Sequence, residues 1–317
     1  MVLGLTAADI GRRVVVRRRI DAGERPLYTD LLGELRSIDA SGVVIRTASD
    51  EVRVPLNEIH RAKTVPERRG VTAREVAALE LAAAEAWPPT ELAWLGDWRL
   101  RAAGGYTGRA NSALPVGDPG VSLGEAIGRV VEFYRERGLP PQVDVPLPLA
   151  GPVERELIKA GWHPECTVYL QVMALDELIA ATPEATGWTL AAQPSAAALE
   201  IVAGRRGPLP EAARHVLTAV ADLRFAEYAE SGDLLAMARG SVTRQWLGLF
   251  AIETVTAARR RGLARQAVGV LARWARTAGA RNAFLQVEST NTTAMALYEK
   301  LGFSTHHRYT RYRKVEA

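Results

Sequence analysis

Short apolar runs separated by turn residues dominate the first 66 residues of the chain. Branched and apolar side chains gather in four such runs, at residues 14–16, 31–38, 43–47 and 52–56. Runs of this length and composition predict β-strands, because branched side chains pack well on a pleated surface. Several strands in so short a segment predict a small closed barrel. We therefore expect a first domain over residues 1–68, with a boundary near residues 66–70.

A helix is predicted to open the next segment. Thr72 followed by Glu75 forms a capping box, in which each side chain accepts a hydrogen bond from the other residue's backbone N–H. Alanines and leucines continue the helical pattern to Ala86, and the pair Pro88-Pro89 ends it.

The chain beyond this point contains a faint internal duplication. At an offset of 141 positions, Phe133, Gly138 and the pair Gly161-Trp162 fall opposite Trp274, Gly279 and the pair Gly302-Phe303, with no gap. Each half is predicted to form a helix, a strand, a second helix and a final strand. We therefore expect two related α+β halves, at residues 70–182 and 185–317. The expected elements are 124–137, 142–146, 152–160 and 167–173, then 262–277, 283–288, 293–300 and 307–312.

Composition and charge narrow the functional classes. The chain has 317 residues, of which 48% are hydrophobic and 24% charged, as is usual for a globular protein. Its net charge of +4 mildly favours anionic ligands and does not indicate nucleic-acid binding. Cys166 is the only cysteine, which excludes an intrachain disulfide and a cysteine-based metal site. No secretory signal or membrane span is predicted, so we expect a cytoplasmic protein.

The most informative segment begins with an apolar run at residues 248–255, which predicts a buried strand. A basic turn at 256–264 follows and leads into an amphipathic helix. A helix start presents unpaired backbone N–H groups, and its dipole favours anions. Gly262 permits close approach of a phosphate, and Ala264 leaves room beside it. We predict a phosphate-binding turn here, the alternative being a basic helix start at the surface. The arginines that would add positive charge are Arg259, Arg260, Arg261 and Arg265.

Neither a Walker loop nor a dinucleotide fingerprint is present. The spacing of Arg259, Gly262 and Ala264 instead matches the acetyl-CoA signature of the GCN5-related N-acetyltransferases. A strand at 284–288, then Asn291, Tyr298 and Gly302-Phe303, is similar to the ending of that family's domain. The first domain resembles SH3-like or Tudor-like modules. A barrel followed by two such halves resembles an actinobacterial subgroup that carries a histone-acetyltransferase-like label.

The resemblance implies the α+β fold of the GCN5-related N-acetyltransferases (GNAT fold), acetyl-CoA as acyl donor and no metal. Backbone groups of Ile252, Glu253 and Thr254 would hold the pantetheine arm and polarise the thioester carbonyl. Asn291 would bind the pantetheine, cap the following helix, or do both. Tyr298 would protonate the departing thiolate, the alternative being a core tyrosine. Backbone N–H groups would bind the pyrophosphate, at Arg260, Arg261, Gly262, Leu263, Ala264 and Arg265.

A general base is harder to assign. The amine must lose a proton to become a nucleophile, so a carboxylate is expected near it, directly or through water. The two positions at which the family often carries this group are Gly248 and Gln286 here. Glu253 and Glu288 are nearby candidates for a catalytic role, each with a structural alternative.

The first half has lost the corresponding cofactor residues. Asp118, Val121 and Leu123 replace the turn residues, Ala150 replaces Asn291, and Leu157 replaces Tyr298. We therefore expect this half to be structural or to shape the acceptor pocket. Arg109 and Asn111 are candidates for acceptor binding, or belong to a plain polar strand.

The sequence thus predicts direct transfer of an acetyl group from acetyl-CoA to a primary amine. A non-catalytic CoA sensor or adaptor, whose barrel docks a partner, is the alternative. His306 and His307 are adjacent, so on a regular strand they would face opposite sides and could not share a metal. Neither the acceptor nor an oligomeric state can be assigned from the sequence.

Overall fold

The structure is a computed structural model that describes the chain except for residues 1–3, 21–26, 48–49, 66–70 and 315–317. The chain forms two compact units, Met1–Gly70 and Val71–Ala317. The boundary expected at residues 66–70 lies outside the described residues. None of the helices described is both long and apolar enough to cross a membrane.

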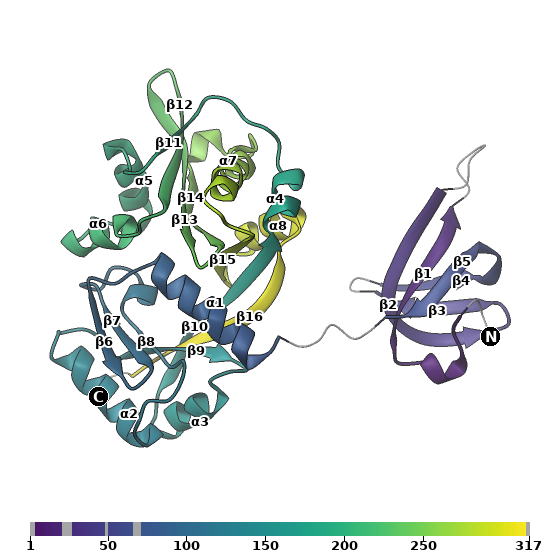
Figure 1. The fold of residues 1–317 in the computed structure, drawn as a ribbon, viewed down its shortest axis with the longest axis horizontal. Helices are drawn as coiled ribbons and strands as arrows, with labels where there is room; N and C mark the ends of the chain where they lie inside the picture. Colours follow the sequence, from purple (N-terminus) through teal and green to yellow (C-terminus); the bar gives the residue numbers. More distant parts are fainter. Residues whose placement is uncertain (1–3, 21–26, 48–49, 66–70, 315–317) are drawn as a thin grey trace. The chain divides into compact units, whose positions relative to one another are not determined.

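The first unit is built from one five-stranded antiparallel sheet (Figure 1). Its apolar side chains alternate into a small core that includes Val14, Val16, Leu35 and Val54, and this confirms the four predicted strands. The order is β4-β3-β2-β1-β5, and no pairing between described residues joins β4 to β5. The expected closed barrel is therefore not observed. The elements are η1 (Ala7–Asp9), β1 (Arg13–Ile20), β2 (Leu27–Asp39), β3 (Gly42–Arg46), β4 (Glu51–Pro55), η2 (Leu56–Glu58) and β5 (Ile59–Thr64).

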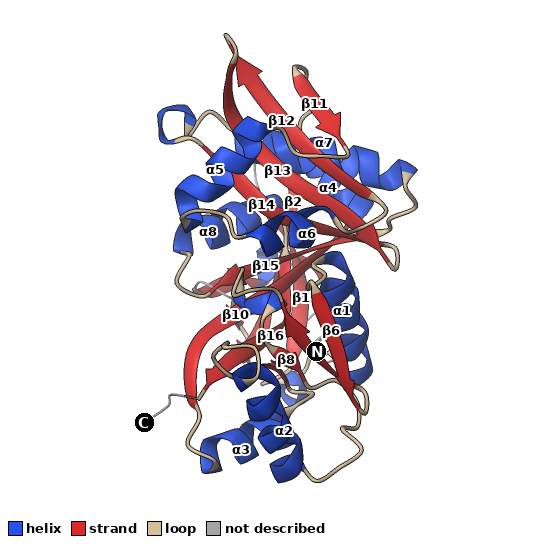
Figure 2. Ribbon diagram, turned by 90° about the vertical axis from the view of Figure 1, so that its left-hand side faces the viewer, coloured by secondary structure: helices blue, strands red, loops and turns tan. Residues whose placement is uncertain are grey.

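An eleven-stranded sheet extends through the whole second unit (Figures 1 and 2). Its strand order is β11-β12-β13-β14-β15-β10-β16-β9-β8-β7-β6. The strands are β6 (Glu91–Leu95), β7 (Trp98–Ala102), β8 (Ala113–Leu114), β9 (Gln142–Leu147), β10 (His163–Ala174), β11 (Trp188–Ala191), β12 (Leu223–Glu230), β13 (Asp233–Thr243), β14 (Trp246–Thr254), β15 (Asn282–Glu288) and β16 (Ser304–Arg313).

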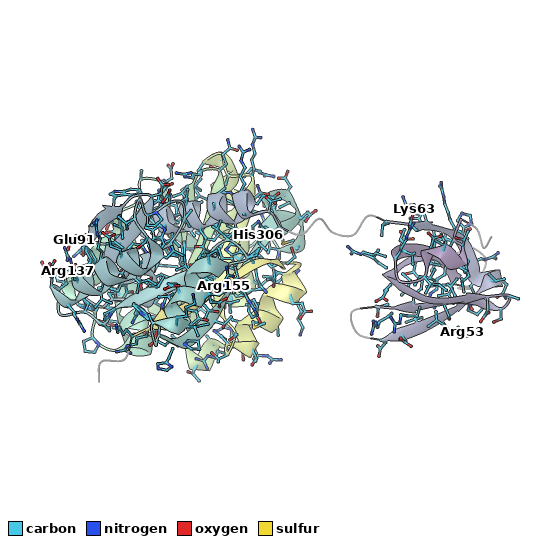
Figure 3. All side chains as sticks on the ribbon, turned by 90° about the horizontal axis from the view of Figure 1, so that it is seen from below. Arg53, Lys63, Glu91, Arg137, Arg155 and His306 are labelled. Atoms are coloured by element: carbon cyan, nitrogen blue, oxygen red, sulfur yellow. The ribbon has the colours of Figure 1, made fainter. Side chains whose placement is uncertain are left out.

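Helices cover both faces of this sheet. On the second half, α5 and α6 lie against one face and α4 and α7 against the other (Figure 1). In the first half, Arg137 just after α2 joins this helix to the sheet through hydrogen bonds of 2.9 and 2.5 Å to Glu91 of β6 (Figure 3). The helices are α1 (Ala73–Ala86), η3 (Gly108–Ala110), α2 (Leu123–Arg135), α3 (Gly151–Lys159), α4 (Leu175–Ala181), α5 (Ala196–Arg206), α6 (Glu211–Thr218), η4 (Thr256–Ala258), α7 (Leu263–Thr277) and α8 (Thr292–Leu301).

The capping box predicted at the start of α1 is confirmed. Thr72 Oγ1 accepts a hydrogen bond from the Glu75 amide at 3.3 Å, and the Glu75 carboxylate accepts one from the Thr72 amide at 2.8 Å.

The two halves exchange their final strands. The elements α2, β9, α3 and β10 recur in the same order as α7, β15, α8 and β16. However, β10 of the first half pairs with β15 of the second, and β16 of the second pairs with β9 of the first. The two exchanged strands also pair with each other, antiparallel, at the centre of the sheet. The division into residues 70–182 and 185–317 stays a prediction from the sequence, because the structure joins both halves in one compact unit.

A buried carboxylate fastens β16 in its exchanged position. Asp144 on β9 lies opposite Arg311 on β16, and the two form hydrogen bonds of 2.7 and 3.1 Å. The same carboxylate accepts hydrogen bonds from Arg101 on β7 at 3.1 Å and from Ser112 at 2.8 Å. Burial by itself disfavours the charge on Arg311, but the Asp144 carboxylate holds the pKa of Arg311 above its usual value.

The adjacent histidines of β16 lie closer together than a regular strand allows. The pairing with β10 shifts register between Leu170 and Gln171, so His306 is the extra residue of a bulge. The two Nδ1 atoms are therefore 2.8 Å apart, and His307 Nε2 lies 2.9 Å from the buried Glu80 carboxylate. The expectation that the two rings face opposite sides is wrong. Among the described residues, no group of three or more potential ligands is arranged to hold a metal ion.

Replacing the buried carboxylate should strongly destabilise the second unit. Asp144→Asn leaves two buried guanidinium groups without a counter-charge, so we expect the free energy of unfolding to fall by about 3–5 kcal/mol. Denaturant unfolding of the full chain measures it. Asp176→Asn, which removes an exposed carboxylate 4.0 Å from Arg276, is the matched control and should change stability by less than about 0.5 kcal/mol. Similar effects for both variants would show that the Asp144 network does not stabilise the unit.

The bulged histidine should make stability depend on pH. Burial and the neighbouring His307 ring lower the pKa of His306 to about 4, while Glu75 acts in the opposite direction. The unfolded chain then binds the proton more readily, so stability is full above about pH 6.5 and decreases as the pH falls toward 4. Between pH 7.5 and pH 4, the melting temperature should fall less in His306→Gln than in the wild type. The exposed His163→Gln is the control, and an unchanged pH profile in His306→Gln would contradict this assignment.

Candidate active site

The sheet opens at the strand that precedes the predicted phosphate turn. β14 and β15 are parallel and pair from Trp246–Asn282 to Leu249–Leu285, although both strands continue beyond this point. On its other side, β14 pairs with β13 through a bulge, where one extra residue lies between Phe250 and Glu253. Ala251 in this bulge has a left-handed φ of 46°. Past Leu249, the edge of β14 that faces β15 therefore has backbone groups without a strand partner.

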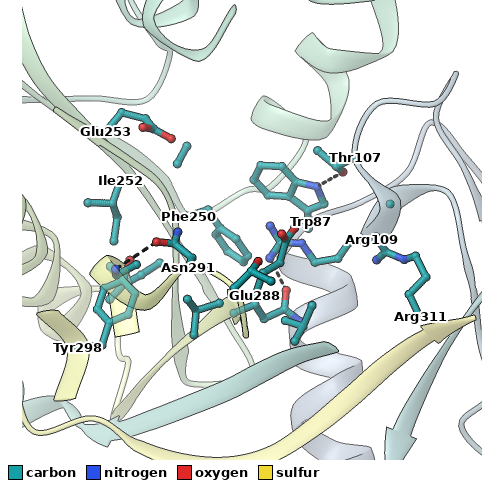
Figure 4. A pocket seen from close by; sticks show the side chains of 18 of the residues that line it. Trp87, Thr107, Arg109, Phe250, Ile252, Glu253, Glu288, Asn291, Tyr298 and Arg311 are labelled. Atoms are coloured by element: carbon teal, nitrogen blue, oxygen red, sulfur yellow. Dashed lines mark hydrogen bonds between the residues drawn. The ribbon is translucent and has the colours of Figure 1, made fainter. Parts of the chain in front are cut away.

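A pocket of about 500 Å³ lies at this opening and draws its walls from both halves. Figure 4 shows Asn291 and Tyr298 on one side, Trp87, Thr107 and Arg109 on the other, and Phe250 between them. The predicted site residues that the structure brings together here are Ile252, Glu253, Glu288, Asn291, Tyr298 and Arg109. Tyr309 and Arg311 of the exchanged strand β16 also line it.

The two residues assigned to the donor side sit on one helix. Asn291 is the N-cap of α8, and its carboxamide oxygen accepts a hydrogen bond from the Ala294 amide at 3.1 Å. Its amide nitrogen is not used in the cap, so capping leaves a donor beside the pocket. Tyr298, about two turns further on, is only 8% exposed and packs edge-on against Phe303, with ring centres 5.9 Å apart.

The turn after β14 leads into α7, whose N-terminus has no side-chain cap. Gly262 is the N-cap of α7 with a left-handed φ of 80°, and no side chain caps this end. The first N–H groups of α7, at Leu263, Ala264 and Arg265, therefore have no acceptor within the helix. Helix dipole and N–H groups together favour an anion at this position. Thr254 and residues 259–265 lie outside the 500 Å³ pocket and follow directly from its β14 wall.

The arginine side chains around this turn are less available than the sequence suggested. Arg261 forms hydrogen bonds of 3.1 and 2.5 Å to Glu230. Arg265 donates to the Ala181 carbonyl, and Arg259 donates to the Thr254 carbonyl at 3.4 Å. Arg260 is exposed, with a left-handed φ of 67°. The backbone N–H groups are thus the better-placed anion donors of this turn.

The corresponding turn of the first half is closed to an anion. Ser122 caps α2 with its own hydroxyl, which accepts a hydrogen bond from the Glu125 amide at 3.3 Å. Asp118 lies in the same turn and accepts a hydrogen bond from the Gly120 amide. A helix start that is capped by a side chain and preceded by a carboxylate disfavours a phosphate.

Neither family position for the general base carries a carboxylate, and the structure shows what stands there. A side-chain carbon added to Gly248 would lie 2.5 Å from the ring of Phe250 and 2.8 Å from that of Phe284. Gln286 accepts a hydrogen bond from Arg109. Glu253 and Glu288 are the carboxylates that line the pocket.

An aromatic and cationic wall was missed from the sequence. The rings of Trp87 and Phe250 are 4.9 Å apart, and the guanidinium groups of Arg109 and Arg239 lie 5.0–5.4 Å from their centres. Arg239 is fully buried on β13, and burial lowers its pKa to about 9. An arginine within an otherwise apolar strand is the sequence signal that would have indicated this wall.

Asn111 has a different place from the one expected. It is buried and does not line the pocket. Its oxygen accepts hydrogen bonds from the amides of Ala103 and Gly105, and its nitrogen donates to the carbonyls of Tyr106 and Thr107. Asn111 thus holds the loop that carries Arg109, and the structure gives no support to direct acceptor binding by this side chain.

Comparisons with known proteins agree with this architecture. Residues 72–313 match the family model described as probable histone acetyltransferase Rv0428c C-terminal, and residues 8–63 match the Rv0428c N-terminal Sm-like domain. The chain belongs to this family of GCN5-related N-acetyltransferases. Its first unit is accordingly an Sm-like domain.

Individual relatives cover most of the chain. It is 32% identical to the probable histone acetyltransferase Rv0428c of Mycobacterium tuberculosis, over 94% of this chain and 93% of that protein. It is 26% identical to the uncharacterized N-acetyltransferase YobR of Bacillus subtilis, over 73% of this chain and 95% of the relative. A GCN5-related N-acetyltransferase from Kribbella flavida has the same fold, with a TM-score of 0.59 at 16% identity, over 78% of this chain and 97% of that one. The similarity of this N-acetyltransferase to the first of these relatives therefore extends over nearly the whole of both chains.

The aromatic wall should not tolerate even one added carbon at the family's base position. Gly248→Ala forces a methyl group against Phe250 and Phe284, so we expect a loss of about 1–3 kcal/mol in stability. Gly128→Ala in the middle of α2, where an added carbon meets nothing within 4 Å, should instead stabilise by about 0.5–1 kcal/mol. Denaturant unfolding of both variants provides the measurement. Stabilisation by Gly248→Ala would show that the wall can move aside and leave room for a carboxylate.

Proposed function

We propose that this N-acetyltransferase binds acetyl-CoA in the opening between β14 and β15 and transfers the acetyl group directly to a primary amine. The observation that carries the proposal is the unpaired edge of β14, which leads from the pocket to the uncapped start of α7. An extended amide chain can add to such a strand edge. A pyrophosphate can then bind at the helix start.

The donor would use backbone groups for most of its contacts. Ile252 lies in the bulge of β14, and Glu253 and Thr254 follow it, where their N–H and C=O groups can pair with the pantetheine amides. The N–H groups of residues 260–265 would bind the pyrophosphate, and the amide nitrogen of Asn291 would bind the pantetheine from the opposite side. A preorganised N–H near the thioester carbonyl would stabilise the oxyanion that forms on attack.

The chemistry would proceed in two steps. The neutral amine attacks the thioester carbonyl, and the carbonyl electron pair moves onto oxygen. The amine's proton leaves to water or to a carboxylate, for which Glu253 and Glu288 are the candidates in the pocket. As the tetrahedral intermediate collapses, the C–S bond breaks and the thiolate takes a proton from the Tyr298 hydroxyl. The products are the acetylated amine and CoA.

The acceptor would approach from the side of the first half. Trp87, Thr107 and Arg109 form that wall, opposite Asn291 and Tyr298 (Figure 4). The first half would therefore shape the acceptor pocket, as expected for a half without a cofactor turn.

The comparisons give no support to a non-catalytic CoA sensor. We also propose a cytoplasmic location. For the first unit we propose an SH3-like arrangement of the five strands, in line with their order β4-β3-β2-β1-β5.

Tyr298→Phe tests the acid step. Without the hydroxyl the thiolate must leave unprotonated, so we expect kcat to fall by about 10²-fold. The packing against Phe303 is retained, so acetyl-CoA at 100 times its Kd should still stabilise the variant by about 2.7 kcal/mol, as it does the wild type. The measurements are CoA release with a panel of primary amines and thermal unfolding with and without the thioester.

Tyr312→Phe is the matched control. Tyr312 hydrogen-bonds Glu154 outside the pocket, so its loss should leave kcat unchanged. A kcat of Tyr298→Phe equal to that of the wild type would show that Tyr298 is not the acid. The absence of any thermal shift with acetyl-CoA in the folded wild type would contradict donor binding itself.

A further inference from the structure

Two guanidinium groups share one pair of aromatic rings at the acceptor wall. The central carbon of Arg109 lies 5.2 Å from the ring centre of Trp87 and 5.4 Å from that of Phe250. The corresponding distances for Arg239 are 5.0 and 5.2 Å. Cation–π attraction stabilises each charge, but the two like charges also repel. Burial is the main cause of the lowered pKa of Arg239, and the charge of Arg109 lowers it further.

Arg239 lacks the counter-charge that a buried arginine normally has. It is fully buried, and none of the carboxylates of the described residues forms an ion pair with it. Its Nε donates to the Leu217 carbonyl at 2.7 Å and its Nη1 to Ser241 Oγ at 3.4 Å. Its Nη2 is shut off from solvent and has no acceptor. The carbonyl in the last turn of α6, the Ser241 hydroxyl and two ring faces thus stabilise this charge, and no carboxylate among the described residues does so.

The other arginine that lines the pocket has a buried counter-charge. Arg311 is paired with Asp144, which also binds Arg101. The partner of Arg109 on β15, Gln286, is an uncharged amide. Of the buried arginines Arg101, Arg239 and Arg311, Arg239 beside the Trp87–Phe250 wall is therefore the one without a carboxylate partner among the described residues, while Glu253 and Glu288 line the pocket itself.

We propose that the acceptor amine carries a carboxylate, which binds beside Arg109 against the Trp87–Phe250 wall and in the field of Arg239. The inference rests on the proposed acetyl transfer and names the class of its substrate. An anion there would offset the repulsion between the two guanidinium groups and form charge-assisted hydrogen bonds with Arg109. Since this wall stands opposite Asn291 and Tyr298, a carboxylate held there directs the amine at the other end toward the thioester (Figure 4).

Matched amines test the proposal on the full-length protein. The panel is the ω-amino acids from glycine to 6-aminohexanoate, each compared with its own amide. Rates of CoA release are corrected for the fraction of neutral amine, because the amide lowers the amine pKa. For at least one chain length, kcat/KM should be about tenfold or more higher for the carboxylate than for the amide.

Substitutions then locate the effect. Arg109→Gln should bring the ratio of kcat/KM for carboxylate and amide close to one. Arg129→Gln, which removes an exposed arginine paired with Glu125 on α2, should leave the ratio unchanged. Arg239→Met should also lower the ratio, and Arg109→Gln decides the matter if Arg239→Met does not fold.

Each other result has a definite meaning. Equal or better turnover of every amide would overturn the carboxylate assignment and leave acetyl transfer intact. A carboxylate preference that appears only on the donor, with succinyl-CoA preferred over acetyl-CoA for a neutral amine, would overturn the assignment to the acceptor. If no amine is acetylated, the proposed function fails, and thermal unfolding of the CoA-bound protein still tests the anion site. 6-Aminohexanoate should then stabilise it more than the amide does, and equal shifts would overturn the inference.

Discussion

The whole second unit depends on a carboxylate buried where the two halves exchange strands. Asp144 holds Arg311 of β16 and Arg101 of β7, so it fixes a strand of the second half among strands of the first. These buried charges are stable only together, because a buried charge without a partner has a large cost in solvation. Because β10 and β16 lie at the centre of the sheet, this contact also sets where Tyr309 and Arg311 enter the pocket. Neither half could therefore build the pocket on its own.

One of the two helix starts that the duplication provides is open, and the other is closed. Gly262 leaves the N–H groups of α7 without a side-chain cap, whereas the Ser122 hydroxyl occupies those of α2. The first half has instead kept a loop, held by Asn111, that brings Arg109 and Thr107 to the pocket of the second half. The use of this half as a pocket wall follows from the exchange of strands, since the exchange places the halves side by side in one sheet.

Local patterns in the sequence predicted what local interactions determine. The capping box at Thr72, the strands of the first unit and the order of elements in both halves follow from periodicity and caps within a few residues. The sequence also predicted Asn291, Tyr298 and Arg109 for the pocket, two of them through family resemblance. It missed the open sheet of the first unit, the strand exchange, the bulge at His306 and the cluster of Arg239 with Trp87. Each of these depends on partners distant in sequence: Arg239 meets Trp87 across 152 positions, and no periodicity records such a contact.

The cationic wall also bears on the missing general base. An attacking amine must be neutral, and a nearby positive charge lowers the pKa of its ammonium form. Phe250 fills the space beside Gly248, and Gln286 binds Arg109, so the site has replaced both family positions for a base by parts of this wall. One carboxylate on the acceptor would offset one of the two guanidinium charges, and the other would still favour loss of the amine proton to water, Glu253 or Glu288. A lysine-rich tail brings further positive charges to the same wall, where Arg109 and the buried Arg239 would repel them. The electrostatics of this wall thus favour a carboxylate on the acceptor over the positive charges of a basic peptide.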